Sequence, residues 1–481
     1  MDPHEIRIAE LEQALESVRA QNTELEQALE SVRAQNTELK ALVQELRARL
    51  NQNSSNSSLP PSSDRPWNRG ARRPQGEQGK RRRGGQKGHS KHSREFVPPE
   101  QVDELHEVFP ERCAGCSRKL RRQAHGEPWR HQVTELPEVK AWVTEYRCHA
   151  SCCEHCGTVT EAVLAEAVPR GMFGPRVLAT VALLTGWFRL SKRNTQDALQ
   201  MLFGVSMSLG AISKAEQQMA AAVAAAVCEA RDYISSHPVR HADETSWTEG
   251  TRKAWLWVAA TPWVSVFMIQ ARRAGHCARQ LLGKVQGILV TDRLKSYGFW
   301  PMHQRQICWA HLGREFDGWA QRAEGTFYQV TGSALRAHVH QMFHWWHRVR
   351  DGTLSRATFQ RCMRPLQKDV ERLLNEGAAC GDLALMGKCA DILEHRQALW
   401  TFVRVEGVEP TNNRAEQDLR HAVIMRKTSF RTDSPRGSRF IERILTVVSS
   451  LRKQQRNPLV FLVACAQAKR QDRPAPSLLP T

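Results

Sequence analysis

Hydrophobic residues in the first fifty positions recur in alternating steps of three and four residues. The stretch LEQALESVRAQNTE at 11–24 is repeated without change at 25–38, so the pattern has a period of two heptads. The seam consists of Ile8, Leu11, Leu15, Val18, Asn22, Leu25, Leu29, Val32, Asn36, Leu39, Val43, Leu46 and Leu50. This spacing is the a/d pattern of a coiled coil, and it predicts one long helix over residues 1–52.

Two asparagines, Asn22 and Asn36, fall on the a position of this seam. A buried asparagine there costs stability but favours a parallel, in-register dimer, because only then does its amide meet its mate. We therefore expect a dimerisation helix and a homodimer or higher oligomer. A solitary amphipathic helix packed on the rest of the chain is the alternative, although the twelve regular steps exceed what such helices usually show.

The hydrophobic pattern stops after Leu50, and residues 53–98 are mostly small, polar or basic. Residues 65–94 hold eleven Lys or Arg and one acid, Glu77. Such a composition cannot bury a core, so it predicts a linker that is disordered until a partner orders it. The charge excess favours contact with DNA phosphates over a solvated spacer. We expect four of its residues to bind DNA: Arg81, Arg82, Arg83 and Lys87.

A helical, apolar pattern returns between residues 174 and 226. Within it, TQDALQMLFGVSMSLGAISKAEQQM predicts a helix, a tight turn at Gly204, and a second helix that begins near Ser208. This is the layout of a helix-turn-helix, whose second helix would read DNA. Any helical hairpin gives the same pattern, so a purely structural hairpin is the alternative.

From residue 238 the pattern changes to that of strands. VRHADET, KAWLWVAA and VSVFMIQ predict a three-stranded meander, HCARQLLGK a helix, and GILVTD and RQICWAH two more strands with a second helix between them. This order predicts a mixed sheet flanked by helices, and it matches a ribonuclease H-like core. In that topology the first and fourth strands are neighbours, so Asp243 and Asp292 would meet at one edge of the sheet.

The charge of the chain narrows the classes of partner. It has 69 Lys and Arg against 50 Asp and Glu, a formal net charge of +19. A surface this basic favours a polyanion, and double-stranded DNA is the leading candidate. Apolar runs fall short of the eighteen or so residues of a spanning helix, so no membrane partner is expected. The start, MDPHEIRIAELE, lacks the pattern of a secretory signal, which implies reduced cysteines.

The spacing of the cysteines therefore indicates metal binding rather than disulfides. Two CxxC pairs, Cys113 with Cys116 and Cys153 with Cys156, each offer two thiolates to a tetrahedral zinc ion. We expect these four residues to form a closed, structural zinc site. Three nearby residues compete with the second pair: Cys148, Cys152 and His155. Unligated buried cysteines are the alternative.

Two adjacent carboxylates such as Asp243 and Asp292 repel each other unless a cation lies between them, and divalent cations with oxygen ligands are the usual solution. A third acid, Glu416, stands in the first turn of the helix predicted from PTNNRAEQDLRHAVIMRK. It would complete an oxygen ligand set if this helix lay against the sheet. The alternatives are that Glu416 only complements the helix N-terminus, and that Asp243 and Glu244 form a turn.

The same helix is strongly basic, and its cations would face DNA phosphate. At about 100° per residue, Arg420 and Lys427 fall within roughly 40° of Glu416. Three of its residues are expected to bind DNA: Arg420, Arg426 and Lys427. Four others would lie near the site or equally pack in the core: His241, Trp247, Trp309 and His311.

Over nearly its whole length the chain resembles a DDE transposase of the insertion-sequence-sixty-six family. The resemblance is carried by NSSNSSLPPSSD after the coiled coil, GGQKGH, the two CxxC pairs, HADETSW, LVTDRLKSY, CWAHLGREF and TNNRAEQDLRHAVIMRK. It implies a ribonuclease H-like catalytic domain in which Asp243, Asp292 and Glu416 bind two magnesium ions, with manganese as a substitute. It also implies a helical insertion between the second acid and the third. Arg293 and Lys295 depart from the small or polar residues of many relatives, which bears on DNA contacts.

The expected architecture is a multidomain chain of α+β and α/β character. Its parts are a coiled-coil dimerisation helix (1–52), a basic disordered linker (53–98), a zinc-binding domain (99–168), a helical DNA-binding region (169–235), a ribonuclease H-like core in two parts (236–315 and 406–470) with a helical insertion between them (316–405), and a disordered tail (471–481).

The expected function is binding of the ends of a mobile DNA element, followed by metal-dependent strand cleavage and strand transfer into target DNA. The alternative is a catalytically silent, dimeric DNA-binding protein or repressor derived from a transposase. The intact set of acids favours the enzyme, since a pure DNA binder has no need to collect carboxylates where phosphates approach. The expected setting is the nucleoid in a prokaryotic cytoplasm, with accessory proteins of the same element as further partners.

Overall fold

The computed structural model describes residues 3–50, 52–53, 56, 95–165, 168, 171–429 and 431–480. Two compact units are present, one of Met1–Gly70, Thr144–Met201 and Val205–Thr481, the other of Ala71–Val143 with Leu202–Gly204. Helices predominate, and the described strands form a five-stranded sheet and a two-stranded hairpin, in agreement with the expected multidomain α+β class. None of the described helices is both long and apolar enough to cross a membrane.

The N-terminal helix α1 runs without interruption over Pro3–Leu50, as the heptad pattern predicts. Its seam from Leu15 onward is exposed, with Leu25 at 66% and Leu39 at 58%. A lone helix cannot bury such a seam, so its pairing into a coiled coil stays a prediction that needs a partner chain. The DNA contacts expected in the basic linker lie outside the described residues: Arg81, Arg82, Arg83 and Lys87.

Each CxxC pair lies on a tight turn with the same backbone pattern. In the first turn, the Cys113 N–H donates to Arg118 O at 2.9 Å, and the Ser117 N–H donates to Cys113 O at 2.9 Å. The second turn joins β1 (Ala150–Cys152) to β2 (Val159–Glu161) and repeats both bonds with Cys153 and Gly157 as donors. Ser117 and Gly157 both have positive φ, which reverses the chain after the second cysteine.

Hydrogen bonds also favour the thiolate form at both turns. The pKa of Cys113 is lowered, first by the backbone of Cys116, and the pKa of Cys156 is lowered, first by the side chain of Thr158. Thiolate is the form that zinc binds. The two turns belong to different units, and a zinc site shared by all four cysteines stays a prediction.

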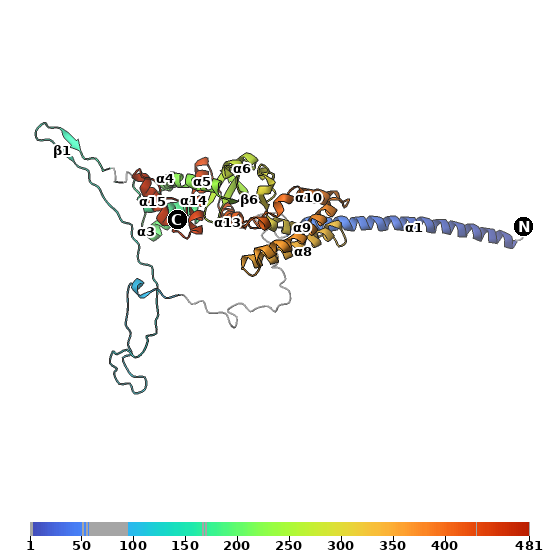
Figure 1. Cartoon of the computed structure of the whole chain (residues 1–481), viewed down its shortest axis with the longest axis horizontal. Coiled ribbons are helices and arrows are strands. Elements are labelled where there is room, and N and C mark those ends of the chain that lie inside the picture. The colour runs from blue at the N-terminus through green and yellow to red at the C-terminus, as the bar shows by residue number, and fades with distance from the viewer. Residues whose placement is uncertain are drawn as a thin grey trace. The chain divides into compact units, whose positions relative to one another are not determined.

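Four helices follow one another directly before the central sheet: α2 (Pro175–Gly186), α3 (Lys192–Phe203), α4 (Leu209–Ala222) and α5 (Ala224–Ser236). The predicted turn between α3 and α4 is confirmed, since Gly204 has φ +65° and the Ser208 side chain accepts from the Ala211 N–H at 3.1 Å. Figure 1 shows α4 beside the C-terminal helices α14 (Pro435–Lys453) and α15 (Pro458–Arg470), on which its buried face packs. DNA reading by α4 stays a prediction.

The central sheet has five strands: β3 (Val239–Glu249), β4 (Arg252–Ala260), β5 (Ser265–Gln270), β6 (Ile288–Thr291) and β7 (Arg305–Ile307). Their order is β5-β4-β3-β6-β7, with β3 to β5 antiparallel and with β6 parallel to both β3 and β7. The predicted meander, the following helix α6 (Gly275–Leu282) and the two further strands are thus confirmed.

The prediction of a second helix, between β6 and β7, is wrong. Residues 292–304, all of them described, hold only two 3₁₀ turns, η4 (Lys295–Tyr297) and η5 (Met302–Gln304). Gly298 and Pro301 lie between these turns and disfavour a continuous helix. The chain therefore crosses from β6 to β7 in a short loop that begins at Asp292.

Strand β5 lies at the edge of the sheet, where its outer N–H groups would lack partners. Helix α14 supplies side-chain acceptors for them at intervals of four residues. The three pairs are Ser265 N–H with Ser450 Oγ at 3.0 Å, Phe267 N–H with Thr446 Oγ1 at 3.0 Å, and Ile269 N–H with Glu442 Oε1 at 2.5 Å. The spacings match because four helical residues rise about 6 Å and two strand residues about 6.6 Å.

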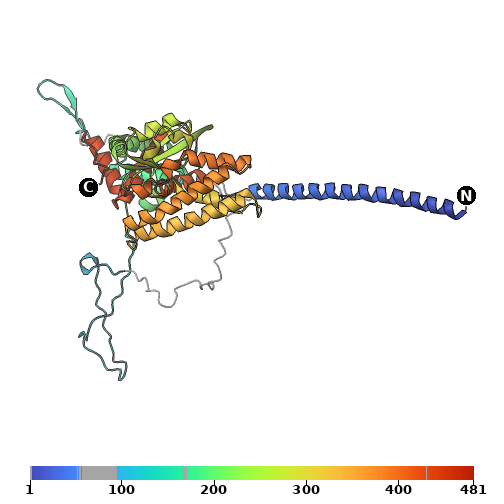
Figure 2. The ribbon, with the colours of Figure 1, turned by 45° about the vertical axis from the view of Figure 1, so that its right-hand side comes forward.

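The chain between β7 and residue 405 is helical, as predicted. Its helices are α7 (Trp309–Ala320), α8 (Phe327–Arg350), α9 (Arg356–Ala378), α10 (Leu383–Glu394), α11 (Arg396–Leu399) and α12 (Thr401–Arg404). Helices α8 and α9 lie side by side, joined by a short turn (Figures 1 and 2). Their apolar faces share one buried cluster with Val290 of β6 and Ile307 of β7, so the helical region is packed on that side of the sheet.

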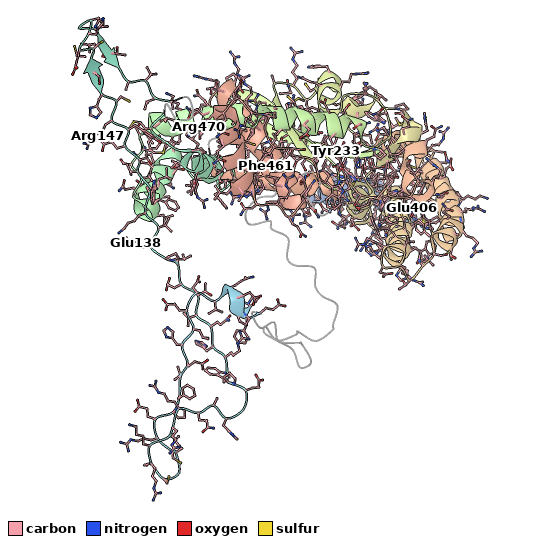
Figure 3. All side chains as sticks on the ribbon, turned by 60° about the vertical axis from the view of Figure 1, so that its left-hand side comes forward. Glu138, Arg147, Tyr233, Glu406, Phe461 and Arg470 are labelled. Atoms are coloured by element: carbon pink, nitrogen blue, oxygen red, sulfur yellow. The ribbon has the colours of Figure 1, made fainter. Side chains whose placement is uncertain are left out.

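The C-terminal residues are not the disordered tail that their composition predicts. Helix α15, which carries Phe461 and Arg470 in Figure 3, is followed by a segment that folds back on the body. Leu478 is fully buried, and the Arg456 guanidinium donates to Ser477 O and Leu479 O, both at 3.0 Å. One apolar anchor and a set of backbone acceptors are enough to order this short stretch.

Candidate active site

The two aspartates meet because their strands are parallel neighbours. Strands β3 and β6 pair with His241 opposite Val290, so Asp243 on β3 lies level with Asp292, the first residue after β6. Both aspartates are half-buried. The neighbour relation predicted for these strands is confirmed.

Glu416 reaches the same place from α13 (Asn413–Thr428), in whose first turn it stands. Alternate residues of a strand point to one face, and α13 packs on the face of β3 that carries Asp243 and Thr245. The Arg426 guanidinium donates to Thr245 Oγ1 at 2.8 Å, which fastens the far end of the helix along the strand. Its first turn then lies close enough for the charge of Glu416 to act on Asp243.

The electrostatics of the site are dominated by negative charge. Burial raises the pKa of Asp243 well above its ordinary value, and the charges of Glu244, Asp292 and Glu416 raise it further. In the described part of the chain, no lysine or arginine lies within ion-pair distance of Asp243, Asp292 or Glu416. Carboxylates gathered in this way repel one another, and the site therefore favours a bound cation.

Glu244 has a role that the sequence analysis missed. It points to the opposite face of β3 from Asp243, and its side chain is fully buried. Oε1 accepts from Arg273 Nε at 2.9 Å, and Oε2 accepts from the Tyr297 hydroxyl at 2.7 Å. Burial raises the pKa of Glu244 and Asp292 adds to this, while Arg273 opposes both. A protein cation thus compensates Glu244, which sets it apart from the other three acids.

Asn412 is a second residue that the motifs did not single out. It is fully buried, and its Nδ2 donates to Ala242 O at 2.8 Å. Its backbone N–H donates to Cys308 Sγ at 3.1 Å, and its carbonyl accepts from the Glu416 N–H at 3.2 Å. Asn412 therefore joins β3, the end of β7 and α13. The paired asparagines of TNNRAE were the available signal, but only burial distinguishes Asn412 from the exposed Asn413.

Cys308 and His311 of the CWAH motif lie beside Glu416. Cys308 Sγ is 3.9 Å and His311 Nδ1 is 3.5 Å from Glu416 Oε1. Burial chiefly lowers the pKa of His311, and burial raises the pKa of Cys308 to about 12. Among the residues that the structure describes, these three form the cluster whose donor atoms are close enough to hold a metal ion, all within 4.8 Å of one another.

The other aromatic candidates belong mainly to the core. Trp247 Nε1 donates to Thr432 Oγ1 at 3.0 Å, and Trp309 Nε1 donates to Leu399 O at 2.6 Å; both rings are buried. His241 is buried next to the site, and burial lowers its pKa to about 3. For the two tryptophans, core packing is the role that the structure shows.

The basic residues of α13 differ in their surroundings. Arg420 and Lys427 are exposed and remain available for DNA, as predicted contacts. Arg426 is half-buried and uses its guanidinium to hold α13 on β3. Its structural role was not foreseen, and a DNA contact by Arg426 stays a prediction.

Arg293, directly after Asp292, is also occupied by the protein. It pairs with Glu315 of α7 and, at 2.8 Å, with Asp391 of α10. On the other side of the loop, Arg305 Nη2 donates to the backbone carbonyl of Asp292 at 3.0 Å. The loop that carries the second aspartate is therefore held by two arginines that leave its carboxylate unpaired with a cation.

A comparison with known protein families shows which family the chain belongs to. Residues 170–439, more than half of the chain, match the Transposase IS66 family, and this stretch contains all three acids. The chain belongs to the IS66 family of transposases. The resemblance inferred from its motifs is thereby confirmed. Residues 2–95 match a family of unknown function (DUF6444), and no curated protein matches the chain.

Proposed function

We propose that this IS66-family transposase binds the ends of its mobile element and then cuts and joins DNA strands, with Asp243, Asp292 and Glu416 as metal-binding catalytic residues. The observation that carries the proposal is the convergence of three acids from β3, β6 and α13 in one electrostatic environment. We further propose that the sheet is a ribonuclease H-like core, because β3, which carries Asp243, and β6, which Asp292 follows, are parallel neighbours in it.

The donor set fits magnesium. Hard divalent cations prefer carboxylate oxygens. Burial raises the pKa of Asp243, and the charges of Glu244, Asp292 and Glu416 raise it further, so its ionised form is disfavoured without a nearby cation. Two magnesium ions, or manganese in their place, would be held by Asp243, Asp292 and Glu416. When bound, the metal would stabilise charge on the phosphate oxygens and promote deprotonation of the attacking oxygen.

The residues around the acids would fix their positions. The register of β3 and β6 sets the separation of Asp243 and Asp292, while Asn412 and Arg426 hold α13 against β3 at its two ends. Such fastening matters because a catalytic group displaced by about 1 Å can cost a hundredfold in rate. Ligands supplied by rigid elements are therefore well suited to catalysis.

The reaction would need no covalent protein intermediate. Water attacks phosphorus at the element end, the P–O3′ bond breaks, and the products are a 3′-hydroxyl on the element and a 5′-phosphate on the flanking strand. That 3′-hydroxyl then attacks a phosphodiester of target DNA and loses its proton to solvent, while the displaced target 3′-oxygen gains one. Each step exchanges one P–O bond for another, so no energy-supplying cofactor is required.

The remaining parts would assemble and target this core. We propose dimerisation through α1, a structural zinc ion on Cys113, Cys116, Cys153 and Cys156, and general DNA affinity from residues 65–94. A silent DNA-binding protein is the less favoured alternative, because the acids are intact and no lysine or arginine within the described residues neutralises them.

The central experiment replaces each acid by its amide and measures cleavage and joining of labelled element ends. Asp243→Asn, Asp292→Asn and Glu416→Gln each keep size and most hydrogen bonding but remove a metal-binding charge. We expect each variant to lose activity by about a hundredfold or more, as for removal of a group that stabilises the transition state. Folding, zinc content and binding of element ends should stay near normal.

A matched control is Glu409→Gln, just before α13. Glu409 forms a partly exposed pair with Arg414 at 3.3 Å, and such pairs contribute little. This variant should retain activity. Full activity in any one of the three acid variants would remove that residue from the proposed site.

A further inference from the structure

The N-terminus of α7 carries two metal donors, a sulfur and an imidazole nitrogen, that the proposed magnesium site does not use. Cys308 is the N-cap residue of α7, and His311 follows one helical turn later, so both side chains project from the same end of the helix. Glu416 approaches them from α13 and directs the same oxygen, Oε1, to both. Three donor types, thiol, imidazole and carboxylate, thus converge from two helices.

The distances approach those of a zinc site. Sγ and Nδ1 lie 3.9 Å and 3.5 Å from Oε1, and all donor atoms lie within 4.8 Å of one another. In a tetrahedral zinc site with bonds of about 2.0–2.3 Å, neighbouring donor atoms are roughly 3.3–3.8 Å apart. Closing around a metal would therefore need only small side-chain movements.

The polar atoms of the cluster are incompletely satisfied by the protein. His311 Nδ1 is buried without a hydrogen-bond partner, although an unsatisfied buried polar atom is costly. The Cys308 sulfur accepts the backbone N–H of Asn412 at 3.1 Å and lies 3.9 Å from Glu416 Oε1, so it faces the same carboxylate oxygen as His311. An imidazole nitrogen without a hydrogen-bond partner and a cysteine sulfur therefore lie beside one carboxylate oxygen, and zinc accepts all three kinds of donor.

We propose that Cys308, His311 and Glu416 form a second metal site, selective for a thiophilic divalent cation of the zinc class, and that its occupation withdraws Glu416 from the two aspartates. Magnesium is a poor occupant because it prefers hard oxygen ligands, whereas zinc binds all three donor types. Binding to this site does not depend on the proposed function. The inhibition that would follow from sharing Glu416 does rest on it.

Metal content of the full chain tests the site directly. Protein that retains its tightly held zinc would be dialysed against fixed free zinc, and metal per chain would be measured for the wild type and for Cys308→Ser. We expect the wild type to take up about one more zinc per chain than the variant. Cys465→Ser, at a buried cysteine of α15 outside the cluster, should match the wild type.

A second variant provides the test if the first does not fold. If circular dichroism shows that Cys308→Ser is unfolded, His311→Gln replaces it, and zinc affinity is measured by titration. The expected loss is at least about tenfold, since one of three protein ligands is removed. Cobalt added to wild type that holds only its tightly bound zinc should also show a sulfur-to-cobalt charge-transfer band that Cys308→Ser lacks. Equal metal uptake by wild type and His311→Gln would overturn the site and leave Cys308 and His311 as packing between two helices.

The proposed sharing of Glu416 between the two metal sites is tested by measuring DNA cleavage at fixed magnesium, with and without zinc. We expect zinc to inhibit the wild type and to inhibit His311→Gln far less, each compared with its own zinc-free rate. Zinc bound at this site with undiminished cleavage would overturn the sharing. Metal uptake is measured without DNA and therefore does not depend on the catalytic role of Glu416. Cleavage by Glu416→Gln would contradict that catalytic role, and the test of the metal site would still stand.

Discussion

Asp243 is held in the folded chain at an electrostatic cost. Its pKa is raised by burial and by three neighbouring carboxyl groups, so its ionised form is disfavoured unless a cation is present. We predict that Asp243→Asn melts higher than the wild type in the presence of a chelator. Each kcal/mol of repulsion removed corresponds to about 2–4 °C in a domain of this size. Differential scanning calorimetry or thermal circular dichroism would measure the change.

Magnesium should reverse the order of the two melting temperatures, so that the wild type melts above Asp243→Asn. It is expected to raise the melting temperature of the wild type by binding the folded state, and to raise that of Asp243→Asn much less. Calcium should stabilise in the same way but support little cleavage, because its coordination is looser. An equal magnesium response in wild type and variant would show that Asp243 is not a ligand.

Asn412 and Asn413 offer a neighbouring pair with different surroundings. Asn412 donates to Ala242 O in the core, whereas Asn413 is exposed. We predict that Asn412→Ala lowers the free energy of unfolding by about 1–3 kcal/mol, because a buried carbonyl loses its donor. The rate of DNA strand cleavage should fall by more than the loss of stability explains, since α13 loses its hydrogen bond to β3, the strand that carries Asp243. Chemical denaturation and a cleavage assay would measure the two effects.

Asn413→Ala is the matched control and should leave both quantities near wild type. If cleavage by folded Asn412→Ala equalled that of the wild type, Asn412 would be a purely structural residue.

At the residue scale, the positions of Asp243, Asp292 and Glu416 in the fold could be predicted, because they stand on a strand, at a strand end and in a first helical turn. The roles of Glu244 and Asn412 could not, because their partners are fixed only by tertiary packing. Arg273 is twenty-nine residues from Glu244, and Ala242 O is one hundred and seventy from Asn412. No local pattern encodes such pairs.

At the element scale, the contact between α14 and the edge strand β5 supports a stability prediction. Thr446→Val removes the acceptor for the Phe267 N–H while conserving side-chain shape. We predict a loss of about 1–3 kcal/mol in the free energy of unfolding, because a buried backbone donor is left unsatisfied. Thr446→Ser keeps the hydroxyl and should lose less, by the cost of one buried methyl group. Urea denaturation of both variants would measure the two losses of stability. Equal losses would contradict the role of the Thr446 hydroxyl as the acceptor for the Phe267 N–H.

Strands and helices were predictable where periodicity is strong. The alternating and apolar runs of β3 to β6 and the cap at Ser208 are examples. The stretch RQICWAH predicts a strand throughout, whereas β7 ends at Ile307 and α7 begins at Trp309. Three strand residues are too few to show a period. The loop between β6 and β7 also escaped prediction, because buried aromatic residues such as Trp300 imitate a helical pattern.

At the scale of the whole molecule, the sequence predicts α1 but a single chain cannot show its partner. The exposed seam and the asparagines on it are consistent with a parallel dimer, which sedimentation of residues 1–52 would test. The four cysteines pose a similar problem, because each pair adopts its turn separately and only bound metal would join them. Association with other chains and ions depends on partners that propensity and pattern do not specify.

The basic segment at 65–94 allows a prediction about DNA affinity that is separate from chemistry. Its eleven Lys and Arg face one acid, and each neutralised phosphate contributes about 0.9 to the slope of log affinity against log salt. Deleting the segment should weaken binding to all duplexes about equally and flatten that slope by several units, since phosphate contacts carry no sequence information. A shuffled segment of equal charge should restore both properties in filter-binding titrations. Loss of preference for element ends alone, with general affinity unchanged, would assign the segment to sequence recognition instead.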